Sequence, residues 1–206
     1  MDSRKLAGRA VHKKDATQKI TELSPFISFI RKRKLQTIVE IGTAKGGTLY
    51  VWCSIAQPDA LIISIDMPGG PFGGGYTFND MKKFRTYKRI KQSLFFLRAD
   101  SHKQTTKKRL MNILNGKKID FLFIDGDHSY RGVKRDFHLY ASLVKRNGLI
   151  AFHDILFHPM VPKCRVDKFW SEIKDRFKYR EFIDKGDDRG WGQWGGIGVV
   201  YYAYQP

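Results

Sequence analysis

The stretch Phe121–Phe137 reads FLFIDGDHSYRGVKRDF and joins a short apolar run to a polar, helical segment through three ionisable side chains. Four apolar residues run into Asp125, and Asp127 and His128 follow it directly in the motif DGDH. Burying a carboxylate without partners is costly. A strand that ends in this way therefore either reaches solvent or delivers charge to a ligand.

Apolar residues at helical spacing mark the segment after this strand. They are Val133, Phe137, Tyr140 and Val144, and Ser129 is the expected N-cap. The same alternation of an apolar strand with a helical segment recurs along the chain, which predicts a parallel sheet covered by helices on both faces. The strands are expected at Thr37–Gly42, Leu61–Asp66, Leu94–Asp100, Ile119–Asp125 and Gly148–Asp154.

A final pair of short strands, Tyr179–Ile183 and Gly196–Tyr204, is expected to form an antiparallel edge. The sequence thus predicts a Rossmann-like, doubly wound α/β sheet of seven strands, mostly parallel with an antiparallel C-terminal strand. At 206 residues the chain is long enough to bury one full core. We expect a single domain over residues 36–206, preceded by a basic helical N-terminal extension over residues 1–35 that packs on the sheet or covers the site.

Basic residues outnumber acidic ones by 38 to 20, which gives a formal net charge of +18. The excess is regional, because residues 81–118 hold thirteen Lys and Arg against one acid and residues 1–35 hold ten against three. Such patches attract phosphate-rich partners or anionic membrane surfaces, although a solvated helix face explains them equally well. No RNP-type aromatic pair, zinc spacing or glycine clamp accompanies them, so nucleic acid is the less favoured partner.

The two cysteines and the N-terminal segment bear on the cellular compartment. Cys53 and Cys164 lie far apart without metal-type spacing, which is typical of a protein from a reducing compartment. The first twenty residues are charged and lack the apolar core of a secretory signal. No run approaches the ~18 apolar residues of a membrane span. We therefore expect a cytoplasmic protein without a membrane span.

Acidic side chains stand at or beside the end of each of the five expected parallel strands. In an open α/β sheet these ends converge on one crevice, where ligands bind. Each acid alone is explained by a helix cap or a turn, but together they indicate a site for hydroxyls, a positive charge or a metal. The five acids are Glu40, Asp66, Asp100, Asp125 and Asp154.

A glycine-rich turn, EIGTAKGG, follows the first strand, and a helix is expected to start near Gly47. Glycine lets the backbone approach a ligand closely, and a helix N-terminus offers free amide donors. Three residues separate Gly42 from Gly46, so the pattern is not the nicotinamide fingerprint G-x-G-x-x-G. Asp66 lies twenty-four positions beyond Gly42, where a carboxylate can accept both hydroxyls of a ribose.

With these motifs the chain resembles the class I S-adenosylmethionine-dependent methyltransferases over nearly its whole length from Thr37 onward. The motifs are VEIGTAKGG, ISID followed by a glycine-rich loop, RADSH, FIDGDHSYRGVKRDF and GLIAFHDI. Within that class it is most similar to the cephalosporin hydroxylase-like group, which is related to sugar and macrolide O-methyltransferases. The resemblance implies a methyltransferase-like domain over residues 36–206 that methylates a hydroxylated small molecule or glycan.

The resemblance also implies which residues bind the cofactor, S-adenosylmethionine. The expected residues are Glu40, Gly42 and Thr43 for the methionine part, Gly46 in the turn, Asp66 for the ribose, Asp100 and Ser101 for the adenine side, and Asp125 at the end of the fourth strand. The charges agree with this cofactor, because it carries a sulfonium and an ammonium. An acid-rimmed crevice attracts both groups, whereas it would repel the pyrophosphate of NAD.

The reacting centre is expected at the last two strand ends. Asp125 and Asp154 end adjacent strands in the expected order, so both carboxylates could face one Mg²⁺ ion, as in metal-dependent O-methyltransferases. The catechol-type relatives follow the second acid with an Asn, whereas Ile155 stands there in this chain. His153 is a further candidate ligand, but imidazole suits softer metals better than Mg²⁺. Alternatively, Asp154 is a structural acid bonded to loop amides.

His128 is the expected general base. It sits three residues after Asp125, where the catechol-type relatives place their basic catalytic residue, and histidine titrates near neutrality. His153 is the expected substitute for this role. The loop Gly69–Gly75 is expected either to close over a bound ligand or to be a mobile connector.

Two other functions are open at the level of sequence. One is an RNA methyltransferase whose basic patches guide its substrate. The other is a non-catalytic basic protein that binds RNA or a membrane surface while keeping a methyltransferase-like fold. A homodimer is left open as well.

Overall fold

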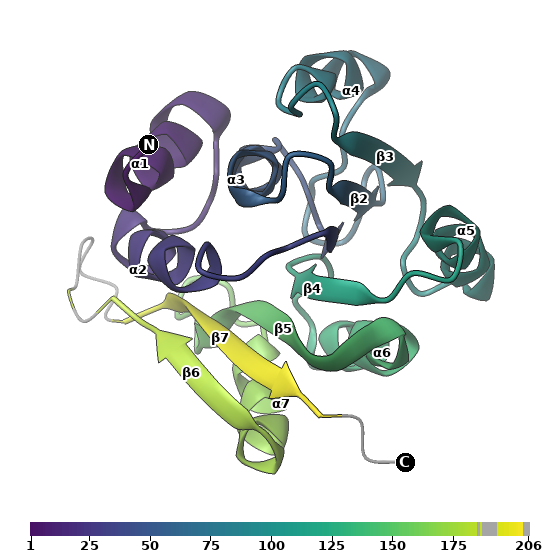
Figure 1. Cartoon of the computed structure of the whole chain (residues 1–206). Coiled ribbons are helices and arrows are strands. Elements are labelled where there is room, and N and C mark those ends of the chain that lie inside the picture. Colours follow the sequence, from purple (N-terminus) through teal and green to yellow (C-terminus); the bar gives the residue numbers. More distant parts are fainter. Residues whose placement is uncertain (185, 187–192, 204–206) are drawn as a thin grey trace.

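The computed structural model describes residues 1–184, 186 and 193–203. Within these residues, seven strands form one sheet. The strands are β1 (Thr37–Ile41), β2 (Leu61–Asp66), β3 (Ser93–Arg98), β4 (Ile119–Ile124), β5 (Val144–Leu156), β6 (Lys178–Phe182) and β7 (Gly195–Tyr202). They lie in the order β3-β2-β1-β4-β5-β7-β6 (Figure 1).

Strand directions confirm the predicted fold class. β1 to β5 pair in parallel, and β7 pairs antiparallel with both β5 and β6. The predicted last strand reaches Tyr204, which lies outside the described residues, and β7 ends at Tyr202.

Helices cover both faces of the sheet, as an alternating pattern of strands and helices predicts (Figure 1). On one face lie α1 (Ser3–Lys14), α2 (Ile20–Ile30), α3 (Gly47–Ile55) and α4 (Phe78–Arg85), and on the other lie α5 (Gln104–Leu114), α6 (Tyr130–Tyr140) and α7 (Val166–Ile173). Each layer has its own apolar core. Successive residues of β1 supply both, because Ile38 packs in the first core and Val39 in the second.

The helix after β4 ends earlier than its apolar spacing predicts. Ser129 caps α6 as expected, since its hydroxyl accepts a hydrogen bond from the Gly132 amide. The prediction that Val144 continues the helix is wrong. A short 3-10 turn, Ala141–Leu143, follows α6, and Val144 begins β5 by pairing with Ile119. Val144 is buried because it belongs to the sheet, and its helical spacing from Tyr140 is a coincidence.

The N-terminal helices contribute to the first core. Leu6 and Ala10 of α1 are buried, and Phe26 of α2 lies against the rings of Trp52 and Phe121. Among the described residues, no helix combines the length and the apolar character that crossing a membrane requires.

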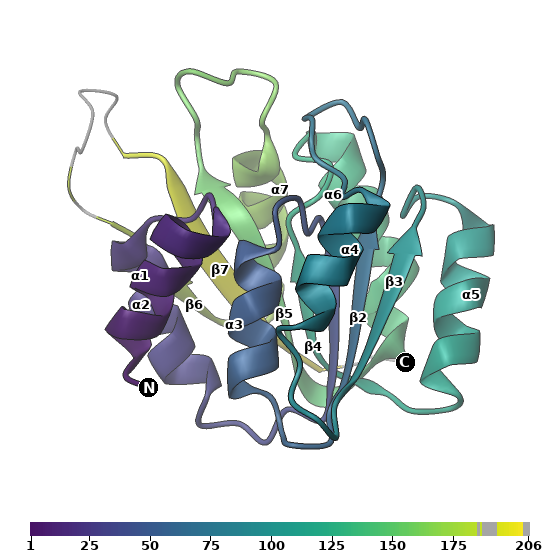
Figure 2. The ribbon, with the colours of Figure 1, turned by 90° about the horizontal axis from the view of Figure 1, so that it is seen from above.

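The loops that follow the parallel strands gather at one edge of the sheet. Figure 2 shows the strands side-on, with the segment after β2 and the segment after β5 rising above the same strand ends. This edge is where ligands bind in open α/β sheets.

Candidate active site

A cavity of about 300 Å³ lies at the carboxyl ends of β1 to β4. Segments that follow each of these strands form its wall, so residues far apart in the sequence meet there. The wall includes Ile41, Gly42 and Ala44 at and after the end of β1, Asp66 and the loop residues 70–74 at and after the end of β2, Asp100 to His102 after β3, and Asp125 to His128 after β4.

The cavity wall brings together part of the predicted site. The predicted residues in the wall are Gly42, Asp66, Asp100, Ser101, Asp125 and His128. The other predicted residues, Glu40, Thr43, Gly46, His153 and Asp154, are outside the wall. Of these, Asp154 and His153 contact wall residues directly, whereas Glu40 lies beneath the glycine turn.

The glycine turn is packed so tightly that two of its positions exclude a side chain. Gly42 has a φ of 86°, and a Cβ at this position would overlap the backbone carbonyl of Asp125. Gly46 has a φ of 84°, and a Cβ there would overlap the ring of Phe84. The turn after β1 and the end of β4 are therefore in direct contact, which sets one corner of the cavity.

Glu40 supports this turn from inside the protein. Its fully buried carboxylate accepts hydrogen bonds from the hydroxyl of Thr43 at 2.6 Å and the indole N–H of Trp52 at 2.6 Å. Burial dominates over these hydrogen bonds and raises the pKa of Glu40 to about 7. The acid of the pattern VEIG thus holds the turn in place rather than lining the cavity.

Asp66 lies against the same turn from the neighbouring strand. One oxygen of its carboxylate accepts hydrogen bonds from the amides of Thr43 at 2.8 Å and Ala44 at 2.6 Å. Burial raises its pKa, although these backbone hydrogen bonds oppose the shift. Asp66 is therefore positioned by the turn while it lines the cavity.

The end of β3 carries a histidine that sequence reasoning missed. His102 lines the cavity, and its Nε2 lies 3.5 Å from a carboxylate oxygen of Asp136, a fully buried residue of α6. This ion pair raises the pKa of His102, and burial raises the pKa of Asp136. Asp100 holds the same segment by accepting the His102 amide at 2.8 Å. The motif RADSH contains the signal, an imidazole at a strand end.

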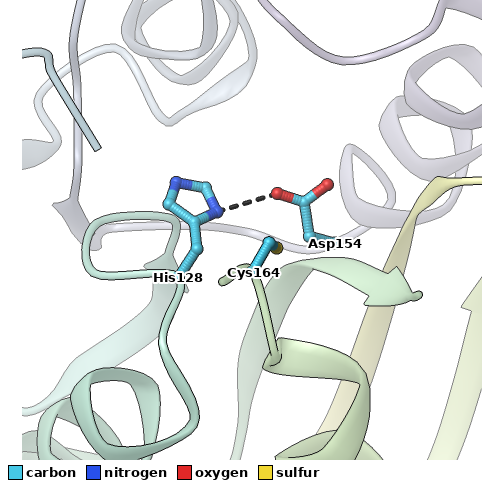
Figure 3. Close-up of side chains that lie close together, drawn as sticks. All are labelled: His128, Asp154 and Cys164. Carbon is cyan, nitrogen blue, oxygen red and sulfur yellow. Dashed lines mark hydrogen bonds and ion pairs between the residues drawn. The ribbon is translucent and has the colours of Figure 1, made fainter. Parts of the chain in front are cut away.

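His128 and Asp154 form a direct pair beside the cavity. His128 Nδ1 lies 2.8 Å from Asp154 Oδ2, and Cys164 lies next to both (Figure 3). Burial opposes the charged imidazole, but hydrogen bonds to Asp154 and Cys164 and the charge of Asp125 outweigh it and raise the pKa of His128 to about 10. Burial also opposes ionisation of Asp154, yet His153 and His128 hold its pKa well below its usual range.

His153 lies deeper, between three carboxylates. Its Nε2 is 2.9 Å from Glu22 Oε1, and its Nδ1 is 3.3 Å from Asp125 Oδ1 and 3.6 Å from Asp154 Oδ1. Burial opposes its charged form, but Asp154 and Asp125 dominate and raise the pKa of His153 well above its ordinary value.

Two N-terminal residues reach this cluster and were missed by sequence reasoning. Gln18 donates a hydrogen bond to Asp125 Oδ2 at 2.7 Å, and Glu22 is fully buried against His153. A signal for Glu22 exists, because it lies four residues before Phe26 and eight before Ile30, on the apolar stripe of α2. A carboxylate on a buried stripe requires a polar partner in the interior.

The acid and imidazole groups fit a bound cation. Asp125 Oδ1 and His153 Nδ1 are buried, and neither makes a hydrogen bond within the described part of the chain, although they face each other at 3.3 Å. Asp125, His153 and Asp154 each bring one ligand atom into a group spanning less than 4.8 Å. His128, Asp154 and Cys164 form a second group of the same size that shares Asp154.

The glycine-rich loop after β2 is tied over the cavity. Phe72 packs its ring 5.0 Å from that of His128, and Lys163 Nζ donates a hydrogen bond to the Pro71 carbonyl at 2.8 Å. The same ammonium lies 4.7 Å from the centre of the Phe72 ring. The loop thus covers His128, the expected general base.

Several solved structures similar to this chain are named as methyltransferases, and their sequence identity to it is low. TomG from Streptomyces achromogenes, in complex with S-adenosylmethionine, matches with a TM-score of 0.63 at 13% identity over 98% of this chain and 91% of that one. An O-methyltransferase from Bacillus cereus matches at 0.61 and 14% identity over 98% and 90%. MycE, with Mg and the demethylated cofactor, matches at 0.61 and 15% identity over 98% of this chain and 55% of that one.

Sequence comparison gives a relative and a family. An uncharacterized protein of Acanthamoeba polyphaga mimivirus is 35% identical over 141 residues, which are 67% of this chain and 61% of that protein. The chain thus spans less than two thirds of the curated relative that it matches. The family model described as a methyltransferase domain matches residues 39–155, which contain β2, β3 and β4 and most of β1 and β5. Together with the fold, this match shows that the chain belongs to the methyltransferase-domain family and has the class I, Rossmann-like fold of its S-adenosylmethionine-dependent members.

Proposed function

We propose that the chain transfers a methyl group from S-adenosylmethionine to a hydroxyl of a small molecule or glycan. The observation that carries this proposal is the single cavity that joins the glycine turn and three strand-end acids to the His128–Asp154 pair. The similar structures named for bound S-adenosylmethionine or its demethylated product support the cofactor.

The wall of the cavity suits a positively charged donor. Asp66, Asp100 and Asp125 contribute carboxylates to one space, and a cation within a few ångströms of such groups is attracted by about 4 kcal/mol at an effective dielectric constant near 20. We assign Asp66 to the ribose and the segment of Asp100 and Ser101 to the adenine side. Gly42 leaves space for the methionine part because it bears no side chain.

His128 is our candidate for the general base. It lines the cavity, and Asp154 fixes the ring through Nδ1, so Nε2 is the nitrogen available to accept the proton of an acceptor hydroxyl. A pKa of about 10 leaves this imidazole protonated at neutral pH. Its use as a base therefore requires that the negative charge of Asp125 and Asp154 be neutralised.

A divalent cation held by Asp125 and Asp154 would meet that requirement and would lower the pKa of the acceptor hydroxyl while fixing its direction. Mg²⁺ is the ion expected from the resemblance, and it is named with the MycE structure. Asp125 Oδ1 and His153 Nδ1, which are buried and make no hydrogen bond to the residues that the structure describes, support a cation at this position.

Calorimetric titration with S-adenosylhomocysteine, the demethylated product, tests the cofactor assignment. We expect binding by the native chain and a loss of about tenfold or more in Asp66→Ala, because hydrogen bonds to a charged group are removed. Asp59→Ala, which removes an exposed carboxylate away from the cavity, is the matched control. Absence of binding at high micromolar ligand would count against a methyltransferase. A screen of hydroxylated acceptors, followed by release of the demethylated product, then identifies the substrate class.

A further inference from the structure

We propose that Glu22, from the N-terminal helix α2, positions His153 as the nitrogen ligand of a metal site completed by Asp125 and Asp154, and that this site prefers Zn²⁺ to Mg²⁺. The inference rests on the proposed function only in placing this site beside the methyl acceptor. The buried polar side chains that carry it extend from α2 to the ends of β4 and β5.

The orientation of His153 follows from the hydrogen bonds of Glu22. Besides facing His153 Nε2, the Glu22 carboxylate accepts the Lys19 amide at 2.9 Å and the Gly196 amide at 2.6 Å. Both Glu22 oxygens act as acceptors in these contacts, as carboxylate oxygens do. The imidazole nitrogen that faces it therefore donates, so Nε2 carries a proton. Nδ1 lies on the opposite side of the ring, where its lone pair can bind a metal ion that takes the place of a proton.

Each of the other two ligands is oriented in the same manner. Gln18 binds one oxygen of Asp125 at 2.7 Å, which leaves the other oxygen facing His153 Nδ1. His128 binds one oxygen of Asp154 at 2.8 Å, which leaves the other oxygen facing the same nitrogen. All three side chains thus have one polar atom held by the protein and another directed into a common space, the arrangement that fixes metal ligands in proteins.

The backbone of β5 is distorted where it supplies two of these ligands. Successive side chains of a regular strand point to opposite faces of the sheet. His153 and Asp154 nevertheless both reach Asp125, because the pairing of β5 with β7 shifts after His153 and Asp154 has a φ of 59°. Such a backbone conformation is costly for a residue with a side chain, and strain of this kind gathers at functional sites.

The separations match those of ligands around one ion. Ligands about 2.0 to 2.2 Å from a metal, at angles of 90° to 109°, lie roughly 2.8 to 3.6 Å apart. The atoms of His153 and Asp125 are 3.3 Å apart, and those of His153 and Asp154 are 3.6 Å apart. One imidazole nitrogen beside two carboxylates suits Zn²⁺ better than Mg²⁺, which prefers oxygen alone. The neighbouring group with Cys164 is less suitable, since His128 Nδ1 already bonds Asp154.

Metal titration without cofactor or acceptor tests the proposal. The full chain is freed of metal with a chelator and titrated with Co²⁺, whose visible absorption reports its ligands, and Zn²⁺ and Mg²⁺ then compete. We expect Zn²⁺ to bind at least about 100-fold more tightly than Mg²⁺. His153→Ala should remove most of this preference. Glu22→Gln should weaken Zn²⁺ binding by about 10-fold to 100-fold, as for other partners that orient a metal ligand.

Two control variants separate the alternatives. Glu172→Gln removes a carboxylate that pairs with Lys134 away from the cavity, and it should leave Zn²⁺ affinity unchanged. Cys164→Ser should also leave it unchanged, and a loss as large as that in His153→Ala would place the ion on the Cys164 group instead. Equal affinity for Mg²⁺ and Zn²⁺ overturns the proposal, as does Zn²⁺ binding that is insensitive to both His153→Ala and Glu22→Gln.

Folding and function are checked separately. Because Glu22 is fully buried, each variant is melted first, and Glu22→Asp replaces Glu22→Gln if that variant does not fold. The shorter carboxylate withdraws from His153, so Zn²⁺ affinity should still fall. The same protein samples are titrated with S-adenosylhomocysteine. If the native protein binds the cofactor but does not prefer Zn²⁺, the metal inference alone is refuted. If the native protein prefers Zn²⁺ but does not bind the cofactor, the proposed function alone is refuted.

Discussion

Gly42 should tolerate no side chain, for two reasons that can be measured apart. Its φ of 86° is a conformation that costs a residue with a Cβ about 1 to 2 kcal/mol. In addition, a Cβ would overlap the carbonyl of Asp125, so the turn after β1 and the end of β4 would have to separate. Overpacking of this kind costs about 1 to 3 kcal/mol. Gly42→Ala should therefore destabilise the protein by about 2 to 5 kcal/mol.

Gly116→Ala isolates the first of these costs. Gly116 has a φ of 78°, but a Cβ there would meet no atom within 4 Å. We expect a loss of about 1 to 2 kcal/mol for this variant, without any change in cofactor affinity. The difference between the two variants then measures the contact between Gly42 and Asp125.

Urea denaturation and thermal melts of both variants provide the assay. A loss of 1 kcal/mol lowers Tm by about 2 to 4 °C in a protein of this size, so Gly42→Ala should melt about 4 to 20 °C below the native chain. Its affinity for S-adenosylhomocysteine should fall as well, because Asp125 must move. Equal stability of the two variants, with cofactor binding unaffected in both, would refute the packing argument.

Three further outcomes are expected. His128→Ala should lower turnover by ~10² or more while S-adenosylhomocysteine affinity stays within about twofold, and unchanged turnover would assign the base elsewhere. Because the pKa of Glu40 in the folded protein, about 7, lies above its ordinary value of 4.5, folding favours the protonated acid, and stability should fall by about 3 kcal/mol as pH rises from 4.5 through 7. Denaturant titrations of Glu40→Gln should lack that slope; a slope equal to that of the native chain would contradict the assignment. Treatment with a chelator should abolish methyl transfer and added divalent metal should restore it, whereas activity that survives chelation would give Asp154 a structural role.

Local patterns explain why most of the fold could be predicted from the sequence. The five parallel strands are short apolar runs that end in or beside acids, and the topology of such sheets brings those ends to one edge. Asp66, Asp100 and Asp125 accordingly meet in one cavity. Glu40 does not line the cavity, because it lies one residue before the end of β1 and its side chain points toward α3. There its carboxylate accepts a hydrogen bond from the indole N–H of Trp52. A difference of one position in a strand decides the face on which a side chain lies.

The deeper part of the site could not be predicted, because it depends on contacts between distant segments. Glu22 and His153 are separated by 131 positions, and no local pattern relates them. The backbone shift after His153, which turns Asp154 toward the same cluster, has no signature in the sequence GLIAFHDI. The sequence showed the chemical character of each group, whereas packing of α2 on the sheet decided which groups meet.

The order of strands has a consequence for biosynthesis. β7 lies between β5 and β6, although it follows both in the chain. Until Gly195–Tyr202 has left the ribosome, β6 has no strand to pair with and one side of β5 stays open. An unpaired, apolar strand edge invites association with other chains. A nascent chain stalled before Gly195 should therefore engage chaperones, and completion of the sheet waits for the strand that lies between β5 and β6.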